Sequence, residues 1–480
     1  MSVVFQNSSG WVLDALPLIN GSYQRCVRIG KGDSSLKCSF KRQYFQTSKS
    51  YYCQSPTAAL AGGKADVLQA TDKQSKKRKR KRSELNQGEV DSQAFHQRVR
   101  SVILEGTKSL VASAQSCGYL NGDADAEKEA LPAPECGLAA LCEMAKELPP
   151  VDDEELKEHP QLLITDGSCT PNIDLFTQVT EHNSGCGAVV PLMGQEYVIP
   201  PHTAFLLSDF TRMKPLINNE KKFDLIVMDP PWENKSVKRS RRYGSLPSSQ
   251  LKRLPIPQFT SPNCLVVTWV TNRPSHLRFV CDELYPYWNV QVVAKWFWVK
   301  VQEISPSVEF RIVMPRVTST RFVCFFVFLF LRSPLWVSLC FRSTHSTRSH
   351  MRRWCWADIT PLLPRGRRPQ NPTNTSEMKE VLIEDSRLIV SVPSALHSHK
   401  PSLSEVLKPY IRPGAECLEL FARSLQPGWT SWGNEVLKFQ HSSYFTLTPA
   451  DDSADTSKEE APDGPSAAPA LSLPPHHYVN

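Results

Sequence analysis

The tetrapeptide Asp229-Pro230-Pro231-Trp232 directly follows the apolar run 223–228 and carries side chains suited to chemistry. The run has the length and β-branched content of a buried strand, so the tetrapeptide should form a stiff turn at its C-terminal end. The Asp229 carboxylate and the Pro230 carbonyl can accept both N–H bonds of a planar exocyclic amine and aim its lone pair at an incoming methyl group. The prolines fix the backbone, and Trp232 offers a flat face to a base. The pattern favours amine methylation over an ordinary strand-ending turn.

The tetrapeptide resembles the DPPW signature of the RNA adenine-N6 methyltransferases, the family of the messenger-RNA N6-adenosine writer. Further motifs of that family follow in order: Tyr243–Leu246, Trp269–Arg273, Trp298–Lys300, Ser398–Pro401, Glu419–Arg423 and Gly433–Glu435. Two stretches, 239–243 and 425–432, look most like one branch of the family. The resemblance covers roughly 197–441, with a break at 302–385. It implies S-adenosylmethionine as cofactor, RNA as partner and substrate, and no metal.

Alternating strands and helices should position these motifs. Strands are expected at 205–210, 223–228, 264–270, 288–301, 387–392, 416–421 and 429–433, with helices at about 246–254, 274–285 and 402–411. This order predicts an α/β fold with a mostly parallel sheet covered on both faces, the Rossmann-like class I methyltransferase sheet. Ligands of such sheets bind at the carboxyl ends of the strands. The catalytic turn precedes the best cofactor-binding strand, 416–421, so a permuted motif order is predicted.

The resemblance also implies a set of cofactor contacts. Asp209 and Phe210 should lie against the adenine of the cofactor, although Asp209 would serve equally as a helix N-cap. Lys400 can pair with the carboxylate of the methionine moiety, and Asn434 and Glu435 match the family's ribose clamp. The predicted cofactor set is Asp209, Phe210, Asp229, Lys400, Glu419, Arg423, Asn434 and Glu435. The chain has no G-x-G-x-x-G motif, which disfavours NAD.

A polar segment, 234–243, follows the catalytic turn, and we call it the basic loop. It holds five cations and ends in a tyrosine, so it can grip phosphates while the ring packs on a base. A loop that is basic only for solubility is the alternative. The predicted substrate contacts are Trp232, Lys238, Arg239, Arg241, Arg242 and Tyr243. Trp269 and Trp298 are expected to fill the core beside the pocket.

Seven consecutive cations, which we call the cationic block, stand at Lys76, Lys77, Arg78, Lys79, Arg80, Lys81 and Arg82. Such a block repels itself and stays accessible to an acidic receptor groove, so it predicts nuclear localisation through an import receptor. The cytoplasm is a second expected location, and a nucleic-acid tether is an alternative role. The net charge of +8 fits a polyanionic partner only weakly, because much of the excess lies in this block.

Cysteine usage and apolar runs restrict the class of protein. The 14 cysteines include no C-x-x-C pair, which indicates free thiols in a reducing compartment and argues against a zinc module. The beginning of the chain lacks the pattern of a secretory signal. The apolar run 322–331 is too short to span a bilayer, so no membrane association is expected.

Five regions are expected along the chain. They are a small N-terminal domain (1–60), a basic linker (61–92), a mostly helical accessory domain (93–196), the methyltransferase domain (197–445) and a disordered tail (446–480). Within the fourth, 302–385 departs from the family and is either an atypical insertion or a gene-model artefact such as intron read-through. Its aromatic run would promote aggregation if it were exposed.

The sequence therefore predicts an S-adenosylmethionine-dependent N6-adenine methyltransferase acting on RNA in the nucleus. Methyl transfer would be a direct displacement that depends on positioning two reactants in one cleft. The same chemistry on DNA is one alternative, because the motifs do not distinguish ribose from deoxyribose. A catalytically inactive RNA-binding scaffold is the other.

Overall fold

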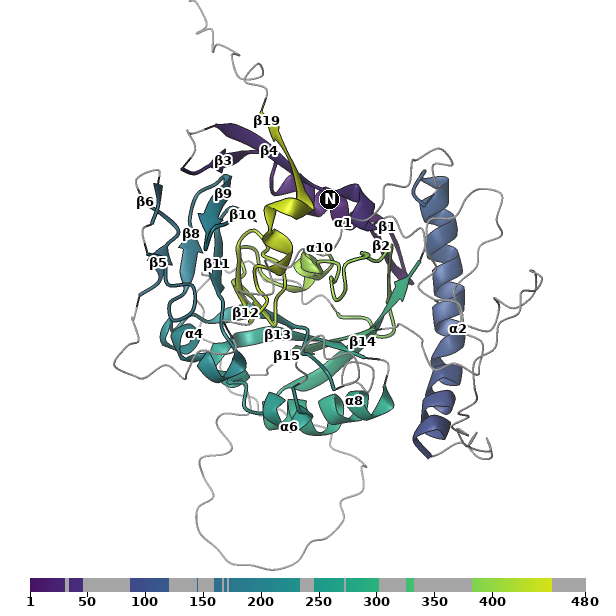
Figure 1. Cartoon of the computed structure of the whole chain (residues 1–480). Helices are drawn as coiled ribbons and strands as arrows, with labels where there is room; N and C mark the ends of the chain where they lie inside the picture. The colour runs from purple at the N-terminus through teal and green to yellow at the C-terminus, as the bar shows by residue number, and fades with distance from the viewer. Residues whose placement is uncertain are drawn as a thin grey trace, which may run out of the picture.

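The computed structural model describes residues 1–30, 34–45, 87–120, 145, 159–165, 168–170, 172–233, 246–271, 273–301, 325–331 and 382–450 (Figure 1). Its centre is a mixed sheet of twelve strands. In spatial order these are β1 (Val3–Asn7), β2 (Gly10–Leu13), β16 (Leu388–Ser391), β14 (Gln291–Lys300), β15 (Phe325–Leu331), β13 (Thr260–Val270), β12 (Phe223–Met228), β17 (Cys417–Leu420), β18 (Trp429–Trp432), β11 (Thr203–Leu206), β8 (Thr180–His182) and β5 (Gln161–Leu162).

The middle of this sheet is parallel. β13, β12, β17, β18 and β11 pair in parallel with one another in that order, and β14, β16 and β2 form a second parallel group. Consecutive parallel strands place their carboxyl ends at one edge, where ligands bind. The predicted α/β fold is therefore confirmed, and β12 and β17 lie side by side at its centre.

Hydrophobic cores cover both faces of the sheet. Successive side chains of a strand point to opposite faces, so each strand contributes to both cores. In β12, Ile226 and Met228 face one hydrophobic core, while Leu225 and Val227 face another. The helices that pack on the first core include α2 (Gln87–Ser116), α6 (Ser248–Leu251), α7 (Ile256–Phe259), α8 (Pro274–Arg278), the π-helix η4 (Phe279–Leu284) and α9 (Tyr285–Tyr287). The second core is closed by α10 (Ser404–Leu407) and the 3-10 turn η6 (Lys408–Tyr410).

A second sheet brings together segments from the start, middle and end of the described chain. Its strands are β10 (Gln195–Ile199), β9 (Gly187–Leu192), β3 (Cys26–Arg28), β4 (Ser35–Phe40) and β19 (Phe445–Pro449). A two-stranded ribbon, β6 (Ile164–Thr165) and β7 (Ser168–Cys169), forms a separate small sheet. The remaining helices are α1 (Ala15–Gly21), α4 (Lys214–Asn218) and the 3-10 turns η1 (Arg42–Phe45), η3 (Phe210–Arg212), η7 (Lys438–Gln440) and η8 (Ser442–Tyr444).

The N-terminal segment departs from the separate domain expected at 1–60. β2 extends the large sheet by pairing with β16, and β3 and β4 belong to the second sheet. Gly10 permits the first of these contacts, because a Cβ there would lie 1.9 Å from the Leu388 carbonyl oxygen. Figure 1 shows α2 standing beside β1 and β2, against which it packs. Long-range pairing therefore joins these residues to the large sheet and to the second sheet.

Two other predicted regions also differ in content. The region 93–196 holds most of α2, but 161–199 contains the strands β5 to β10, so this region is not mostly helical where the structure describes it. Apart from Ala145, residues 121–158 of this region lie outside the described residues. The expected disordered tail begins with a strand, because β19 pairs with β4 as far as Pro449.

The apolar run in the atypical segment 302–385 forms β15, which pairs antiparallel with β13 on one side and β14 on the other. The backbone of this strand is therefore paired at both edges inside the sheet, which leaves no strand edge open for pairing with another chain. The rest of 302–381 lies outside the described residues. No described helix has the length and apolarity needed to cross a bilayer.

Candidate active site

The catalytic turn lies at the carboxyl end of β12, beside β17. The Asp229 backbone N–H donates to the Leu420 carbonyl across this pair of strands (3.3 Å). The Pro230 carbonyl accepts from the Trp232 N–H at 2.8 Å, and the Pro231 carbonyl accepts from the Leu246 N–H at 3.0 Å. A carbonyl oxygen has two lone pairs, so Pro230 keeps capacity for a substrate N–H.

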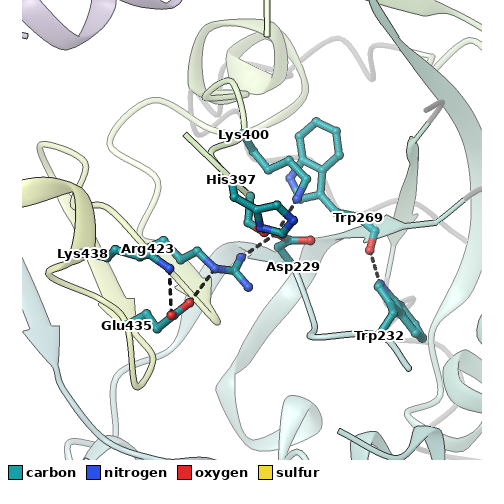
Figure 2. Close-up of polar contacts among 9 residues, drawn as sticks. Asp229, Trp232, Trp269, His397, Lys400, Arg423, Glu435 and Lys438 are labelled. Carbon is teal, nitrogen blue, oxygen red and sulfur yellow. Dashed lines mark hydrogen bonds and ion pairs between the residues drawn. The ribbon is translucent and has the colours of Figure 1, made fainter. Parts of the chain in front are cut away.

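Two cations hold the Asp229 carboxylate. Lys400 Nζ lies 2.5 Å and Arg423 Nη1 2.8 Å from the same oxygen, Oδ2 (Figure 2). All three side chains are 11–13% exposed, so water screens them little. Because both cations use Oδ2, Oδ1 is the oxygen that can accept an N–H from substrate. The structure thus brings Asp229, Lys400 and Arg423 together from three separate motifs of the sequence.

The ion pairs continue beyond Arg423. Its Nε donates to Glu435 Oε2 at 2.9 Å, and Lys438 Nζ donates to Glu435 Oε1 at 2.9 Å. Burial acts to raise the pKa of Glu435, but Lys438 and Arg423 outweigh it and the pKa is lowered. Burial lowers the pKa of Lys400, and the Asp229 charge opposes that shift. The result is a charged chain that runs from the catalytic carboxylate to the turn after β18.

Glu419 lies on β17 beside this chain and behaves differently. Burial raises the pKa of its carboxyl to about 7, and the nearby Asp229 adds to the shift, while a hydrogen bond from Gln426 opposes it. Gln426 Nε2 donates to Glu419 Oε2 at 2.8 Å, and Ser402 Oγ donates to Gln426 Oε1 at 2.5 Å. Glu419 can therefore exchange a proton near neutral pH, whereas Glu435 stays ionised.

Most of these residues, but not Glu435 and Lys438, line one cavity. Its walls include Asp229, Lys400, Glu419 and Arg423, together with Trp269. Another part of the lining comes from the N-terminal segment: Leu18, Ile19, Tyr23 and Phe40. The predicted methyltransferase domain thus does not enclose the cavity alone.

Other predicted cofactor residues lie outside this cavity. Asp209 and Phe210 follow β11, where the Asp209 carboxylate caps η3 by accepting from the Thr211 N–H at 3.1 Å. Asp209 is therefore the N-cap of η3, the role that was the alternative to a cofactor contact. Asn434 is half-buried after β18, next to Glu435. The close packing of Gly433 fixes this turn, since a Cβ there would lie 2.9 Å from the Ala422 carbonyl oxygen.

Trp232 offers a base little surface in this structure. Its side chain is 6% exposed, its ring stacks on His276 and its Nε1 donates to the Trp269 carbonyl at 2.8 Å. Base stacking on this indole would require the ring or its neighbours to move. Trp269 and Trp298 are buried at 2% and 1% exposure, in agreement with their predicted core role.

Some predicted residues cannot be placed, and some residues of the site were not predicted. Lys238, Arg239, Arg241, Arg242, Tyr243 and the cationic block 76–82 lie outside the described residues.

Gln426, Ser402, Lys438 and His276 were missed. Gln426 and Ser402 stand in loops at the carboxyl edge of the sheet, which was the available signal. Among the described residues, no group of three or more His, Cys, Asp or Glu side chains is arranged to hold a metal ion.

Comparison with known proteins supplies the family. The profile of the MT-A70 family matches residues 223–314 and 367–435, and the unmatched stretch between these two segments, 315–366, is shorter than the break expected at 302–385. The human N(6)-adenine-specific methyltransferase METTL4 is 39% identical, over 93% of this chain and 98% of that protein. The Pyricularia oryzae N6-methyladenosine RNA methyltransferase MTA1 is 27% identical, over 52% and 57%. The Caenorhabditis elegans DNA N6-methyl methyltransferase is 28% identical, over 53% and 56%. The predicted family and branch are confirmed, and the chain belongs to the MT-A70 family of methyltransferases.

Proposed function

We propose that this enzyme transfers a methyl group from S-adenosylmethionine to the exocyclic N6 amine of adenine in RNA. The observation that carries the proposal is the Asp229 carboxylate, whose Oδ2 is held by Lys400 and Arg423 at the end of β12. Fixing one oxygen orients the other, so Oδ1 and the Pro230 carbonyl can accept the two amine N–H bonds. Such a preorganised pair of acceptors acts without reorganisation during the reaction.

The residues present fit S-adenosylmethionine, which MT-A70 methyltransferases generally use. Lys400 offers a cation for the carboxylate of the methionine moiety. Asn434 and Glu435 offer oxygen atoms to ribose hydroxyls, and each Glu435 oxygen retains a lone pair beside its cation. When bound, the cofactor supplies an electrophilic methyl group. We assign β17 as the cofactor-binding strand, so that the catalytic turn precedes it in the chain.

RNA is preferred over DNA on the resemblance of the motifs and on the fungal relative, which is named as an RNA methyltransferase. The nematode relative, named as a DNA methyltransferase, supports the alternative. The basic loop would grip the phosphates of either polymer. We also propose that the cationic block carries the enzyme into the nucleus through an import receptor.

The test is mass spectrometry of N6-methylated nucleosides after incubation of the purified protein with separate RNA and DNA oligonucleotides. RNA product that is absent with Asp229→Ala supports the proposal, provided that the variant still binds S-adenosylhomocysteine. Product on DNA alone would select the alternative polymer. Absence of N6-methylated product on both would refute the proposed function.

A further inference from the structure

The end of β13 and the helical turn that follows it hold the indole of Trp232 from two sides. The Trp232 ring lies on the His276 ring with centroids 5.0 Å apart and planes inclined by 23°. Its Nε1 donates to the Trp269 carbonyl at 2.8 Å. Thus the end of β13 fixes the edge of the indole, and the first helical turn beyond it covers one face.

His276 is itself fixed within that segment. Its side chain is buried at 6% exposure, and its Nδ1 shares a hydrogen bond with Thr271 Oγ1 at 2.6 Å. Burial lowers the pKa of His276 to about 4, with Arg273 adding to the shift and Glu233 opposing it. The imidazole is therefore neutral at neutral pH and can pack on the indole without bringing a charge into the core.

The catalytic acceptors are tied to this indole by a short, stiff connection. Only two prolines separate Trp232 from Asp229, and proline fixes its own φ. The Trp232 N–H also donates to the Pro230 carbonyl, the second acceptor for the substrate amine. A shift of the Trp232 backbone that follows a tilt of the indole would therefore be passed on to both acceptors.

We propose that His276 is a positioning residue, which stacks on Trp232 and thereby sets the catalytic turn so that Asp229 and the Pro230 carbonyl meet the substrate amine. This inference rests on the proposed function and gives the Trp269–Arg273 segment a role in it. It assigns Trp232 as an anchor of the turn rather than a platform for the base. The two roles differ in kinetics, since a platform acts on substrate binding and an anchor acts on turnover.

Steady-state kinetics on an RNA oligonucleotide, with calorimetry of S-adenosylhomocysteine binding, separates these roles. His276→Ala should lower kcat by about 10- to 100-fold, as expected for a displacement of about 1 Å in a reaction that depends on positioning. KM and the Kd of the cofactor product should stay within about threefold, because the anchor acts on turnover rather than binding. His276→Phe keeps an aromatic ring and should recover most of kcat, whereas His276→Asn keeps hydrogen-bonding capacity and should not. His182→Ala is the matched control, since His182 is also buried but lies on β8 away from the cavity.

A second measurement does not depend on activity. The Trp232 indole N–H, assigned in an NMR spectrum with Trp232→Phe, should be protected from exchange in the wild type and His276→Phe. It should lose protection in His276→Ala. Unchanged protection in His276→Ala would overturn the positioning role. So would recovery of kcat in His276→Asn but not in His276→Phe, or a rise in KM at constant kcat. If the wild type makes no N6-methyladenine, the proposed function fails, and the indole signal still decides whether His276 holds Trp232.

Discussion

Removal of the Arg423 guanidinium should destabilise the fold through two carboxylates at once. Arg423 joins Asp229 to Glu435 by contacts of 2.8 and 2.9 Å, and all three side chains are at most 16% exposed. Two charge-assisted hydrogen bonds of roughly 1.5–3 kcal/mol each are lost in Arg423→Ala. Each acid keeps one lysine partner, so we expect a loss of about 2–4 kcal/mol in the free energy of unfolding.

A second arginine provides the matched control. Arg412 pairs with Asp224 at 2.7 Å, but its side chain is 52% exposed. Solvent screens that pair, so Arg412→Ala should cost much less. Urea denaturation of both variants at pH 7, followed by circular dichroism, measures the difference. Equal losses in the two variants would show that burial does not strengthen the Asp229–Arg423–Glu435 chain.

The pH dependence checks the same reasoning. The pKa of Glu435 is lowered in the folded state, with Lys438 and Arg423 outweighing burial. Its contribution is therefore present above its ordinary pKa of 4.5 and is lost as the pH falls through the folded value. In Arg423→Ala the folded pKa moves back upward, so this acid-induced loss of stability should be smaller than in the wild type. An unchanged acid limb would contradict the assignment.

Four further outcomes follow from the structure and the sequence. The pKa of Glu419 is raised to about 7, so wild-type stability should fall as the pH rises from 4.5 to about 7, and Glu419→Gln should abolish that fall in denaturation at several pH values. Neutralising the three arginines of the basic loop should reduce the salt dependence of RNA binding by about 2–3 units of slope, and an unchanged slope would return the loop to a solubility role. Replacing the cationic block with Gln and Ser should move a fluorescent fusion to the cytoplasm, unless import uses another segment. The amides of β15 should exchange as slowly as those of β13 in hydrogen-exchange mass spectrometry, since both strands are paired inside the sheet, and fast exchange would place β15 outside it.

Local patterns predicted the centre of the fold well. The strands at 223–228, 264–270, 416–421 and 429–433 were visible because apolar runs of strand length end at polar turns. Since the carboxyl ends of parallel strands meet at one edge, the motifs after them were expected to converge. Asp229 and Arg423 do so.

The features of the fold and the site that the sequence could not predict depend on contacts between distant residues. The burial of Trp232 is decided by His276, which lies beyond the next strand, and no periodicity links the two. The pairing of β2 with β16 joins residues almost 380 positions apart, so a separate N-terminal domain was the natural expectation. The length of loops and the partners of their side chains are set by tertiary packing, which is why Gln426 and Lys438 were missed.

The cavity wall built from the N-terminal segment has a consequence for the synthesis of the protein. Leu18 and Phe40 line the cavity together with Asp229, and so does Phe445 near the other end of the described chain. During translation the catalytic turn emerges some two hundred residues before this last wall. The site can therefore form only after residue 445 has left the ribosome. Until then, apolar surface of the strands synthesised earlier stays unburied. Nascent chains of this enzyme should depend on chaperones, and folding should be limited by these long-range closures rather than by the central strands.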